Sequence, residues 1–372
     1  MNRLLRLVSL IFFTILISAF SQSESASSRP SDIQTQFHPP FLPFGGDQSI
    51  TLELVGQFPT AADALKLKIV DDLAYVVEGS GGLQIIDVST AVSPTLVSNF
   101  STIGSAFDVD VVGQTAYIAE SGLEIVDVSQ PISPTLLGSF IDDQQYDVEV
   151  INQRAYLGGQ GDFHIIDISD ARNPALLGGY SGYPMSVYGY YNFQISGELA
   201  YVNIFEYSSP DTGGFAILDV SDPGHINWIS SHTLMYTWPN LIRKWNNLIY
   251  CAGTRDPKVP PFPFLSVVDV SDPGRPLETS RLSNEYTSTT TMEVTGGMLY
   301  LITAEAGQST FHLISTHDPW NLTEWIAFAI PWQVADIQVR GDLIYLAARS
   351  EGLQILRLNY PYKMYVPLVQ NE

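Results

Sequence analysis

Cysteine is almost missing from this chain of 372 residues, which contains only Cys251. A single cysteine cannot form an internal disulfide, and it cannot supply a metal site built from several thiolates. In the repeat described below, Cys251 falls at a position that holds Val, Ile or Leu in the other units. We therefore expect a small, buried apolar residue without a reactive role.

Positive charge is also scarce, because 17 Lys and Arg residues stand against 39 Asp and Glu residues, giving a formal net charge of −22. A chain of this sign repels phosphate backbones and anionic membranes, so we expect no nucleic-acid partner. We expect the acidity to serve mainly solubility, with cation binding as the alternative. Hydrophobic residues make up 45% of the chain, which excludes a disordered protein.

Familiar catalytic signatures are missing as well. The sequence contains no Gly-x-Ser-x-Gly elbow, no His-Glu-x-x-His pair, no glycine-rich phosphate loop and no Asp-x-Asp-x-Asp-Gly calcium loop. His164 and His312 hold the same position in two different repeat units, so we do not expect them to meet. The histidines therefore predict no active site.

Long apolar runs are limited to one, Leu7 to Phe20, which follows Arg3 and Arg6 and ends in a small-x-small cleavage site, Ala19-Phe20-Ser21. This pattern predicts a secretory signal over residues 1–28. The run is too short to favour a membrane-spanning helix. We expect the mature chain to be exported, secreted or at the cell surface, to lack a transmembrane segment, and to be a monomer.

What the chain has in abundance is one repeated motif. Gly82-Leu83-Gln84-Ile85-Ile86-Asp87-Val88-Ser89 returns as Gly122-Leu123-Glu124-Ile125-Val126-Asp127-Val128-Ser129, each time followed by a proline turn. A tyrosine near the start of a strand marks seven units, at intervals typical of four-stranded blades. The markers are Tyr75, Tyr117, Tyr156, Tyr201, Tyr250, Tyr300 and Tyr345. Alternating, β-branched segments favour strands over helices.

The seventh unit ends after Leu358 without a fourth strand, and a matching strand stands at residues 50–58. We interpret this displaced strand as the closure of a ring, which removes exposed sheet edges. The sequence thus predicts an all-β, seven-bladed β-propeller of four-stranded blades over residues 49–359, whose N-terminal strand completes the last blade. Residues 29–48 are expected to form an extended leader.

The repeated Gly-Leu-x-Ile-Ile-Asp-Val-Ser motif resembles the LVIVD repeat family of exported β-propeller proteins, over about residues 50–358. Unit six replaces the Asp with Ser315, and unit seven replaces it with Arg357. The resemblance implies a propeller outside the cell and implies no reaction. We expect the repeated aspartates to accept hydrogen bonds in a turn rather than to bind ligands.

Two rows of mostly polar residues belong to the first strands, which line the axis of a propeller. The upper row stands nine residues before each marker tyrosine and comprises Lys66, Asp108, Asp147, Asn192, Leu241, Thr291 and Asp336. The lower row stands seven residues before it and comprises Lys68, Asp110, Glu149, Gln194, Arg243, Glu293 and Gln338. We expect these rows to face a wet channel or the clefts beside it. A bound cation such as Ca²⁺ is the alternative.

Departures from the repeat concentrate in units four and five, where the connections between second and third strands lengthen to 205–214 and 254–264. These connections share one face of a propeller with the links between units, so their aromatic side chains should gather there. A filled lid over the blades is the competing interpretation. The candidate partner-binding residues are Tyr183, Tyr188, Tyr191, Tyr207, Tyr236, Trp238, Phe262, Phe264 and Trp332.

The sequence therefore favours an exported, non-enzymatic propeller that binds an extracellular or cell-surface protein or polysaccharide through this aromatic face, without a cofactor. The alternative is a metal-assisted hydrolase or lyase at the channel mouth, with Asp108, Asp147 and Asp336 as metal ligands. A purely structural module without a ligand is a third reading. Residues 360–372 form a tail outside the repeat that resembles short C-terminal tails of exported bacterial proteins, and sorting is one role to consider for it.

Overall fold

A computed structural model describes residues 50–159, 162–181, 192–205, 212–235, 237–255, 263–283, 288–305 and 307–360. The chain divides into two units between Asp47 and Gln48, and every described residue lies in the second. The signal, the leader and all of the tail after residue 360 fall outside the described residues. Among the described residues, no helix has the length and apolarity needed to cross a bilayer.

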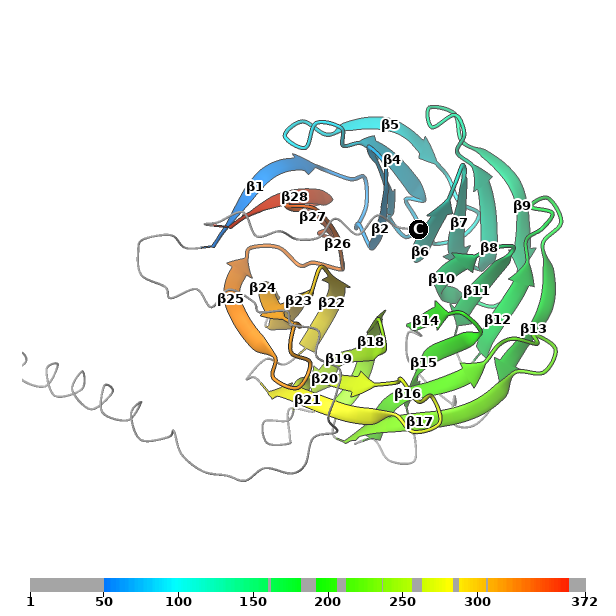
Figure 1. Ribbon diagram of the computed structural model, residues 1–372. Coiled ribbons are helices and arrows are strands. Elements are labelled where there is room, and N and C mark those ends of the chain that lie inside the picture. Colours follow the sequence, from blue (N-terminus) through cyan, green and yellow to red (C-terminus); the bar gives the residue numbers. More distant parts are fainter. Residues whose placement is uncertain are drawn as a thin grey trace, which may run out of the picture. The chain divides into compact units, whose positions relative to one another are not determined.

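Within these described ranges, twenty-eight strands form seven antiparallel sheets of four strands each, arranged around a central axis (Figure 1). Blade one contains β2 (Lys66–Val70), β3 (Leu73–Val77), β4 (Leu83–Asp87) and β5 (Thr95–Phe100). Blade two contains β6 (Asp108–Val112), β7 (Thr115–Glu120), β8 (Gly122–Asp127) and β9 (Thr135–Ile141). Blade three contains β10 (Gln145–Ile151), β11 (Arg154–Gly159), β12 (Asp162–Asp167) and β13 (Ala175–Ser181).

The next three blades keep the same order. Blade four contains β14 (Phe193–Ser196), β15 (Leu199–Phe205), β16 (Thr212–Asp219) and β17 (Asn227–Met235). Blade five contains β18 (Thr237–Trp245), β19 (Leu248–Arg255), β20 (Pro263–Asp269) and β21 (Leu277–Ser283). Blade six contains β22 (Ser288–Thr295), β23 (Met298–Glu305), β24 (Gln308–Ser315) and β25 (Thr323–Ile330).

Blade seven closes the ring as the sequence predicts. It contains β26 (Asp336–Arg340), β27 (Leu343–Ala347), β28 (Leu353–Asn359) and, as its outer strand, β1 (Thr51–Phe58). Thr51 pairs with Asn359, and Phe58 pairs with Leu353. The strand from the N-terminal end thereby covers the free edge of β28, which would otherwise remain available for pairing with another chain.

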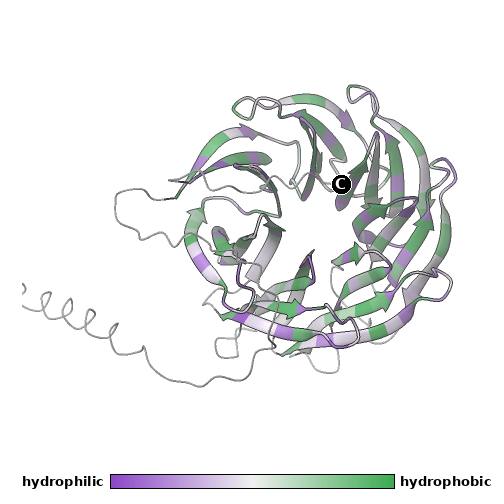
Figure 2. Ribbon diagram, viewed as in Figure 1, coloured by the Kyte–Doolittle hydropathy of each residue, from purple (hydrophilic) through white to green (hydrophobic). Residues whose placement is uncertain are grey.

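The core lies between the blades. Apolar side chains fill the middle strands of each sheet, whereas outer strands mix polar and apolar residues (Figure 2). Leu83 and Ile85 of blade one, for example, pack with Val109 and Ile118 of blade two. Cys251 is 1% exposed within such a cluster, as its position in the repeat predicts, and burial raises the pKa of its thiol well above the ordinary value.

Every outer strand carries one bulge at the same place, next to the proline turn of the following blade where such a turn exists. The bulge in β5 lies opposite Ile85 and Ile86, and Ser98 beyond it donates a hydrogen bond of 2.5 Å to the carbonyl of Pro131 in blade two. In blade five, the Thr279 hydroxyl likewise donates a hydrogen bond of 3.0 Å to the carbonyl of Pro319 in blade six. Bulges sharpen the local twist, so each outer strand bends toward its neighbour.

Candidate functional site: the polar channel rows

The repeated aspartates have the turn role that the sequence predicts. In blade one, the Asp87 carboxylate accepts a hydrogen bond of 2.8 Å from the backbone N–H of Ser89. Hydrogen bonds from the hydroxyl and the N–H of Ser89 lower the pKa of Asp87. The same bond, between 2.8 and 3.0 Å long, recurs at Asp127, Asp167, Asp219 and Asp269. Each aspartate therefore stabilises a turn at the outer part of its own blade.

The two polar rows, by contrast, join neighbouring blades. The first strand of each sheet is an edge strand, so its backbone N–H groups lack a partner within the blade. Side chains of the preceding blade supply the missing acceptors. In the upper row, Asp108 accepts from the N–H of Val148 at 3.0 Å, and Asp147 accepts from that of Phe193 at 3.1 Å. Asn192 continues the series by accepting from Ile242 at 2.8 Å.

The lower row repeats this arrangement two residues further along each strand. Asp110 accepts from the N–H of Val150 at 2.8 Å, and Glu149 accepts from that of Ile195 at 2.8 Å. Further links of the same kind run from Gln194 to Lys244, from Glu293 to Val339 and from Gln338 to Ile69. Carboxylate and amide side chains at these positions therefore supply hydrogen-bond acceptors to the neighbouring blade.

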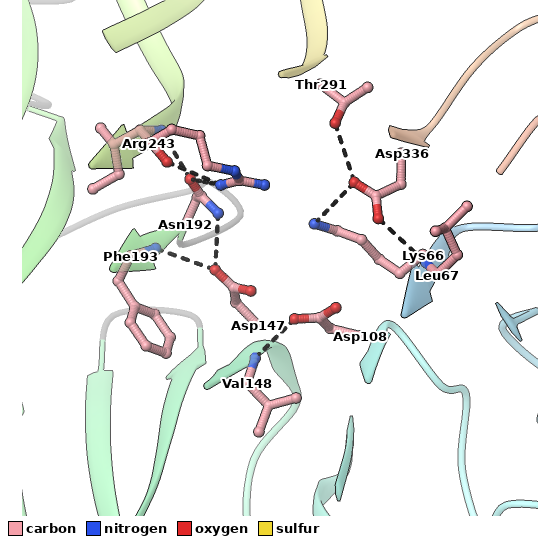
Figure 3. A network of polar contacts seen from close by, with 11 residues as sticks. Lys66, Leu67, Asp108, Asp147, Val148, Asn192, Phe193, Arg243, Thr291 and Asp336 are labelled. Carbon is pink, nitrogen blue, oxygen red and sulfur yellow. Dashed lines mark hydrogen bonds and ion pairs between the residues drawn. The ribbon is translucent and has the colours of Figure 1, made fainter. Parts of the chain in front are cut away.

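The ring is closed between blades seven and one by the same chemistry. Oδ2 of Asp336 accepts from the N–H of Leu67 at 3.2 Å, and its Oδ1 accepts from the Thr291 hydroxyl at 3.1 Å (Figure 3). The Lys66 ammonium lies 3.7 Å from the same Oδ1. Burial alone would lower the pKa of Lys66, but nearby carboxylates, Asp336 foremost, raise it above its ordinary value. Lys66 thus places a positive charge among the acids.

Several of these acids are buried enough to hold their protons near neutral pH. Burial raises the pKa of Asp108 to about 8; Lys66 opposes the rise, and the adjacent Asp147 adds to it. Burial likewise raises the pKa of Glu149 to about 7 and that of Glu293 to about 8. Desolvation disfavours the charged form of a carboxyl group, which explains the direction of all three shifts.

The structure does not assemble Asp108, Asp147 and Asp336 into a metal-binding group. Within the described ranges, no three His, Cys, Asp or Glu side chains are arranged to hold a metal ion. Asp147 has one oxygen engaged by two donors, and both Asp336 oxygens have partners. These residues therefore do not fit the divalent cation of the alternative hypothesis, and they instead tie neighbouring blades together.

Of the nine aromatic residues predicted to bind a partner, only Trp332 is described in full. It is half-buried and packs against the apolar cluster between blades six and seven. The backbones of Trp238 and Phe264 belong to strands β18 and β20. Both residues were expected to lie in loops that connect strands. The remaining six lie outside the described residues: Tyr183, Tyr188, Tyr191, Tyr207, Tyr236 and Phe262.

The stretched connections of blades four and five are partly strand because their hairpins continue pairing toward one face. Second strands all begin two residues before the marker tyrosine, but β3 and β27 have 5 residues whereas β19 and β23 have 8. Thr237 and Trp238 pair with Arg255 and Thr254 in this extension. The extra length thus rises on the face that carries the connections between second and third strands, here called the loop face.

One buried network was not predicted from the sequence. In blade six, His312 is fully buried; its Nε2 lies 2.8 Å from the Thr303 hydroxyl, and its Nδ1 lies 2.5 Å from a carboxylate oxygen of Glu324. Burial lowers the pKa of His312 despite the Glu324 carboxylate. A signal was present, because the same repeat position holds Gln84, Glu124 and His164, all polar within an otherwise apolar strand.

Seven four-stranded sheets around one axis, closed by a strand from the other end of the chain, define a β-propeller. The LVIVD repeat model matches four times, at residues 61–102, 103–142, 145–181 and 191–233. The first four blades are thus similar to LVIVD repeats. No curated protein matches the chain.

Solved structures agree on the fold at low sequence identity. A chain in the mitotic checkpoint complex is 12% identical with a TM-score of 0.61, covering 87% of this chain and 99% of its own length. The computationally designed Ika8 protein is 10% identical with a TM-score of 0.58, covering 82% and 100%. Sqt1 of Saccharomyces cerevisiae is 9% identical with a TM-score of 0.57, covering 83% and 99%. Such likeness shows the fold alone.

Proposed function

We propose that this protein is an exported, non-enzymatic β-propeller that binds an extracellular or cell-surface protein or polysaccharide on its loop face. The observation that carries the proposal is the uneven height of that face. Blades four to six extend their hairpins beyond those of blades seven and one, which forms a step on one side of the ring. The signal-like N-terminus, residues 1–28, supports export.

The extended side is also where the sequence concentrates aromatic residues, and rigid aromatic rings bind partners at a low entropic cost. The polar rows support a role without chemistry, because most of their side chains are engaged by backbone groups of neighbouring blades. A scaffold held rigid in this way presents its connections in a fixed arrangement. A flat sugar ring or an extended peptide suits such a surface.

The test is binding of the purified chain, without residues 1–28, to a glycan array and to intact cells. One variant replaces residues 256–262, between β19 and β20, with a short glycine-containing turn, and a second combines Trp238→Ala with Tyr207→Ala. Both should weaken binding by at least about tenfold, as expected when central aromatic contacts are lost. The proposal fails if binding occurs and both variants retain it.

Trp320→Ala is the matched control. Trp320 is 59% exposed in a turn on the opposite face, so this variant also removes a surface tryptophan but should leave binding unchanged. Metal analysis of the same preparation addresses the hydrolase alternative. Stoichiometric metal that disappears in Asp147→Ala would favour that alternative over a binding module.

A further inference from the structure

Two buried glutamates hold the link between blades one and two at the loop face. Glu120 ends β7 and Glu124 lies in β8, and they are only 3% and 1% exposed. Oε2 of Glu120 accepts a hydrogen bond from the backbone N–H of Gly104. Oε1 of Glu124 accepts one of 3.2 Å from the backbone N–H of Ile103. Two successive amide groups of the link, residues 101–106, are thus bound by two carboxyl groups of blade two.

Both side chains point into the cleft between blades one and two. Ile118 stands two residues before Glu120 in β7, and Val126 stands two residues after Glu124 in β8. Residues two apart in a strand lie on the same face. Ile118 and Val126 belong to the apolar cluster shared with blade one, so the two acids lie on that side as well. Tyr75 is the only titratable member of this cluster, and burial raises its pKa, so it stays neutral at neutral pH.

No positive charge among the described residues balances this pair of acids. Within the described ranges, neither glutamate forms an ion pair, and the only titratable group that acts on Glu124 is Glu120. The link itself has no ionisable side chain. Oε2 of Glu124 has no hydrogen-bond partner. An ionised Glu124 is therefore a poorly compensated charge in an apolar cleft, which is costly.

The cost falls when water reaches the two acids. Burial raises the pKa of Glu124 to about 7 from an ordinary value of 4.5, and the neighbouring Glu120 adds to the rise. Burial also raises the pKa of Glu120, against the hydrogen bond from Gly104. Lifting the link would hydrate both groups and return their pKa values toward the ordinary one. The open form thus releases protons that the closed form keeps, so opening becomes more favourable as the pH rises from about 4.5 to about 7.

We propose that Glu120 and Glu124 form a pH-sensitive latch on the link between blades one and two. The link stays closed while Glu124 carries its proton, and it opens more often when that proton is lost. Ile103, in the middle of the link, is 66% exposed, so the latch controls the position of an apolar side chain on the loop face. The latch lies in blades one and two, so it does not depend on the partner proposed for the extended hairpins.

Blade one contains the same link without the second acid, which provides an internal control. Glu78 stands in the place of Glu120 and accepts a hydrogen bond of 2.9 Å from the backbone N–H of Ala62. Gln84 stands in the place of Glu124 and cannot ionise. The link into blade one, residues 59–64, should therefore respond to pH much less than the link into blade two.

The experiment is hydrogen–deuterium exchange of the purified chain, without residues 1–28, followed by mass spectrometry between about pH 5 and pH 7. Each exchange rate is divided by the rate of an unstructured peptide at the same pH, which leaves the protection due to structure. Protection of residues 101–106 should fall at least about tenfold over this range, because the opening constant rises by up to tenfold per pH unit. Protection of residues 59–64 should fall much less.

Two reciprocal variants complete the test. Glu124→Gln keeps the acceptor but removes the proton, so residues 101–106 should become as insensitive to pH as residues 59–64. Gln84→Glu should transfer the sensitivity to residues 59–64, and its melting curve shows whether it is folded; if it is not, Glu124→Gln alone decides. The proposal is overturned if the two links of the wild-type chain respond equally to pH, or if Glu124→Gln retains the full response. A folded Gln84→Glu variant that gains no response also contradicts it.

Discussion

Some buried polar residues of this propeller pair with one another inside a single blade. His312 shows this at its clearest, because both ring nitrogens have partners inside blade six, the Thr303 hydroxyl and the Glu324 carboxylate. The hydroxyl–imidazole–carboxylate order resembles a catalytic relay. Thr303, however, is 1% exposed, and His312 is not exposed at all, so no substrate reaches the hydroxyl. The network instead stabilises blade six.

His312→Ala should therefore lower the free energy of unfolding by roughly 2–4 kcal/mol, since it leaves a cavity and buried polar partners without hydrogen bonds. Urea denaturation followed by far-UV circular dichroism measures the change. His225→Ala is the control, because His225 also contacts a carboxylate, Asp222, at 3.0 Å but its side chain is 83% exposed. An equal loss in both variants would contradict a buried structural role for His312.

The contacts of His312 with Thr303 and Glu324 could not be predicted from the spacing of these residues in the sequence. His312 faces Leu301 in β23, and the bulge between Leu313 and Ile314 shifts the register toward β25, which brings Glu324 within reach. The sequence shows that His312 interrupts an apolar strand, but it does not show where a bulge shifts the register of the neighbouring strand.

At the scale of elements, the repeat motif specifies a contact between blades as well as a turn within one. The proline turn of each blade from one to six lies against the outer strand of the blade before it. At the closest approaches the outer strand has glycine. A Cβ atom on Gly178 would overlap the carbonyl oxygen of Pro223 in blade four, and one on Gly138 would overlap that of Ala171 in blade three.

Gly178→Ala should destabilise the protein by about 1–3 kcal/mol, the usual cost of forcing extra volume into a packed contact. Thermal and urea denaturation both report this loss. The matched control is Gly224→Ala in the turn on the other side of the same junction. There the new Cβ would lie 3.4 Å from Asp222 Oδ1, an ordinary contact, so stability should change little. If Gly178→Ala behaves like the control, the blades are not in close contact here.

Strands, turns and ring closure could be predicted from the sequence because each depends on local patterns that recur seven times. The repeated motif that runs from Gly122 to Ser129, for example, contains the whole of β8. The use of the polar rows could not be predicted, because a repeat shows that Asp110 and Glu149 are equivalent without showing which neighbouring backbone each one meets. That contact exists only once the ring has closed.

At the scale of the whole molecule, the two polar rows fasten seven sheets around one axis. Not every blade has a hydrogen-bond acceptor in these rows, and the blades without one are joined in other ways. Blade five carries Leu241 in the upper row, where it packs in the apolar cluster shared with blade six. Blade one carries Lys66 and Lys68, which pair with acids from blades seven and two. The ring thus combines hydrogen bonds, ion pairs and apolar packing around its inner circumference.

The same rows should make the stability of the propeller fall as the pH rises through neutrality. Burial raises the pKa values of Asp108, Glu149 and Glu293 to about 8, 7 and 8, from ordinary values of 3.8, 4.5 and 4.5. The folded chain therefore keeps protons that the unfolded chain releases. The stability from this difference is fully present below the ordinary pKa values and is lost progressively up to about pH 8, by up to about 1.4 kcal/mol per pH unit for each group.

Urea denaturation at intervals between about pH 7 and pH 9 tests this, since the unfolding free energy should decrease there, above the pH range in which the lowered pKa of His312 affects stability. The exposed turn aspartates such as Asp87 do not oppose the trend, because their lowered pKa values affect stability only in acid. Asp108→Asn and Glu293→Gln preserve the acceptor but cannot ionise, so they should flatten the profile. A wild-type profile that rises with pH, or variants that leave its slope unchanged, would show that these acids ionise freely despite their burial.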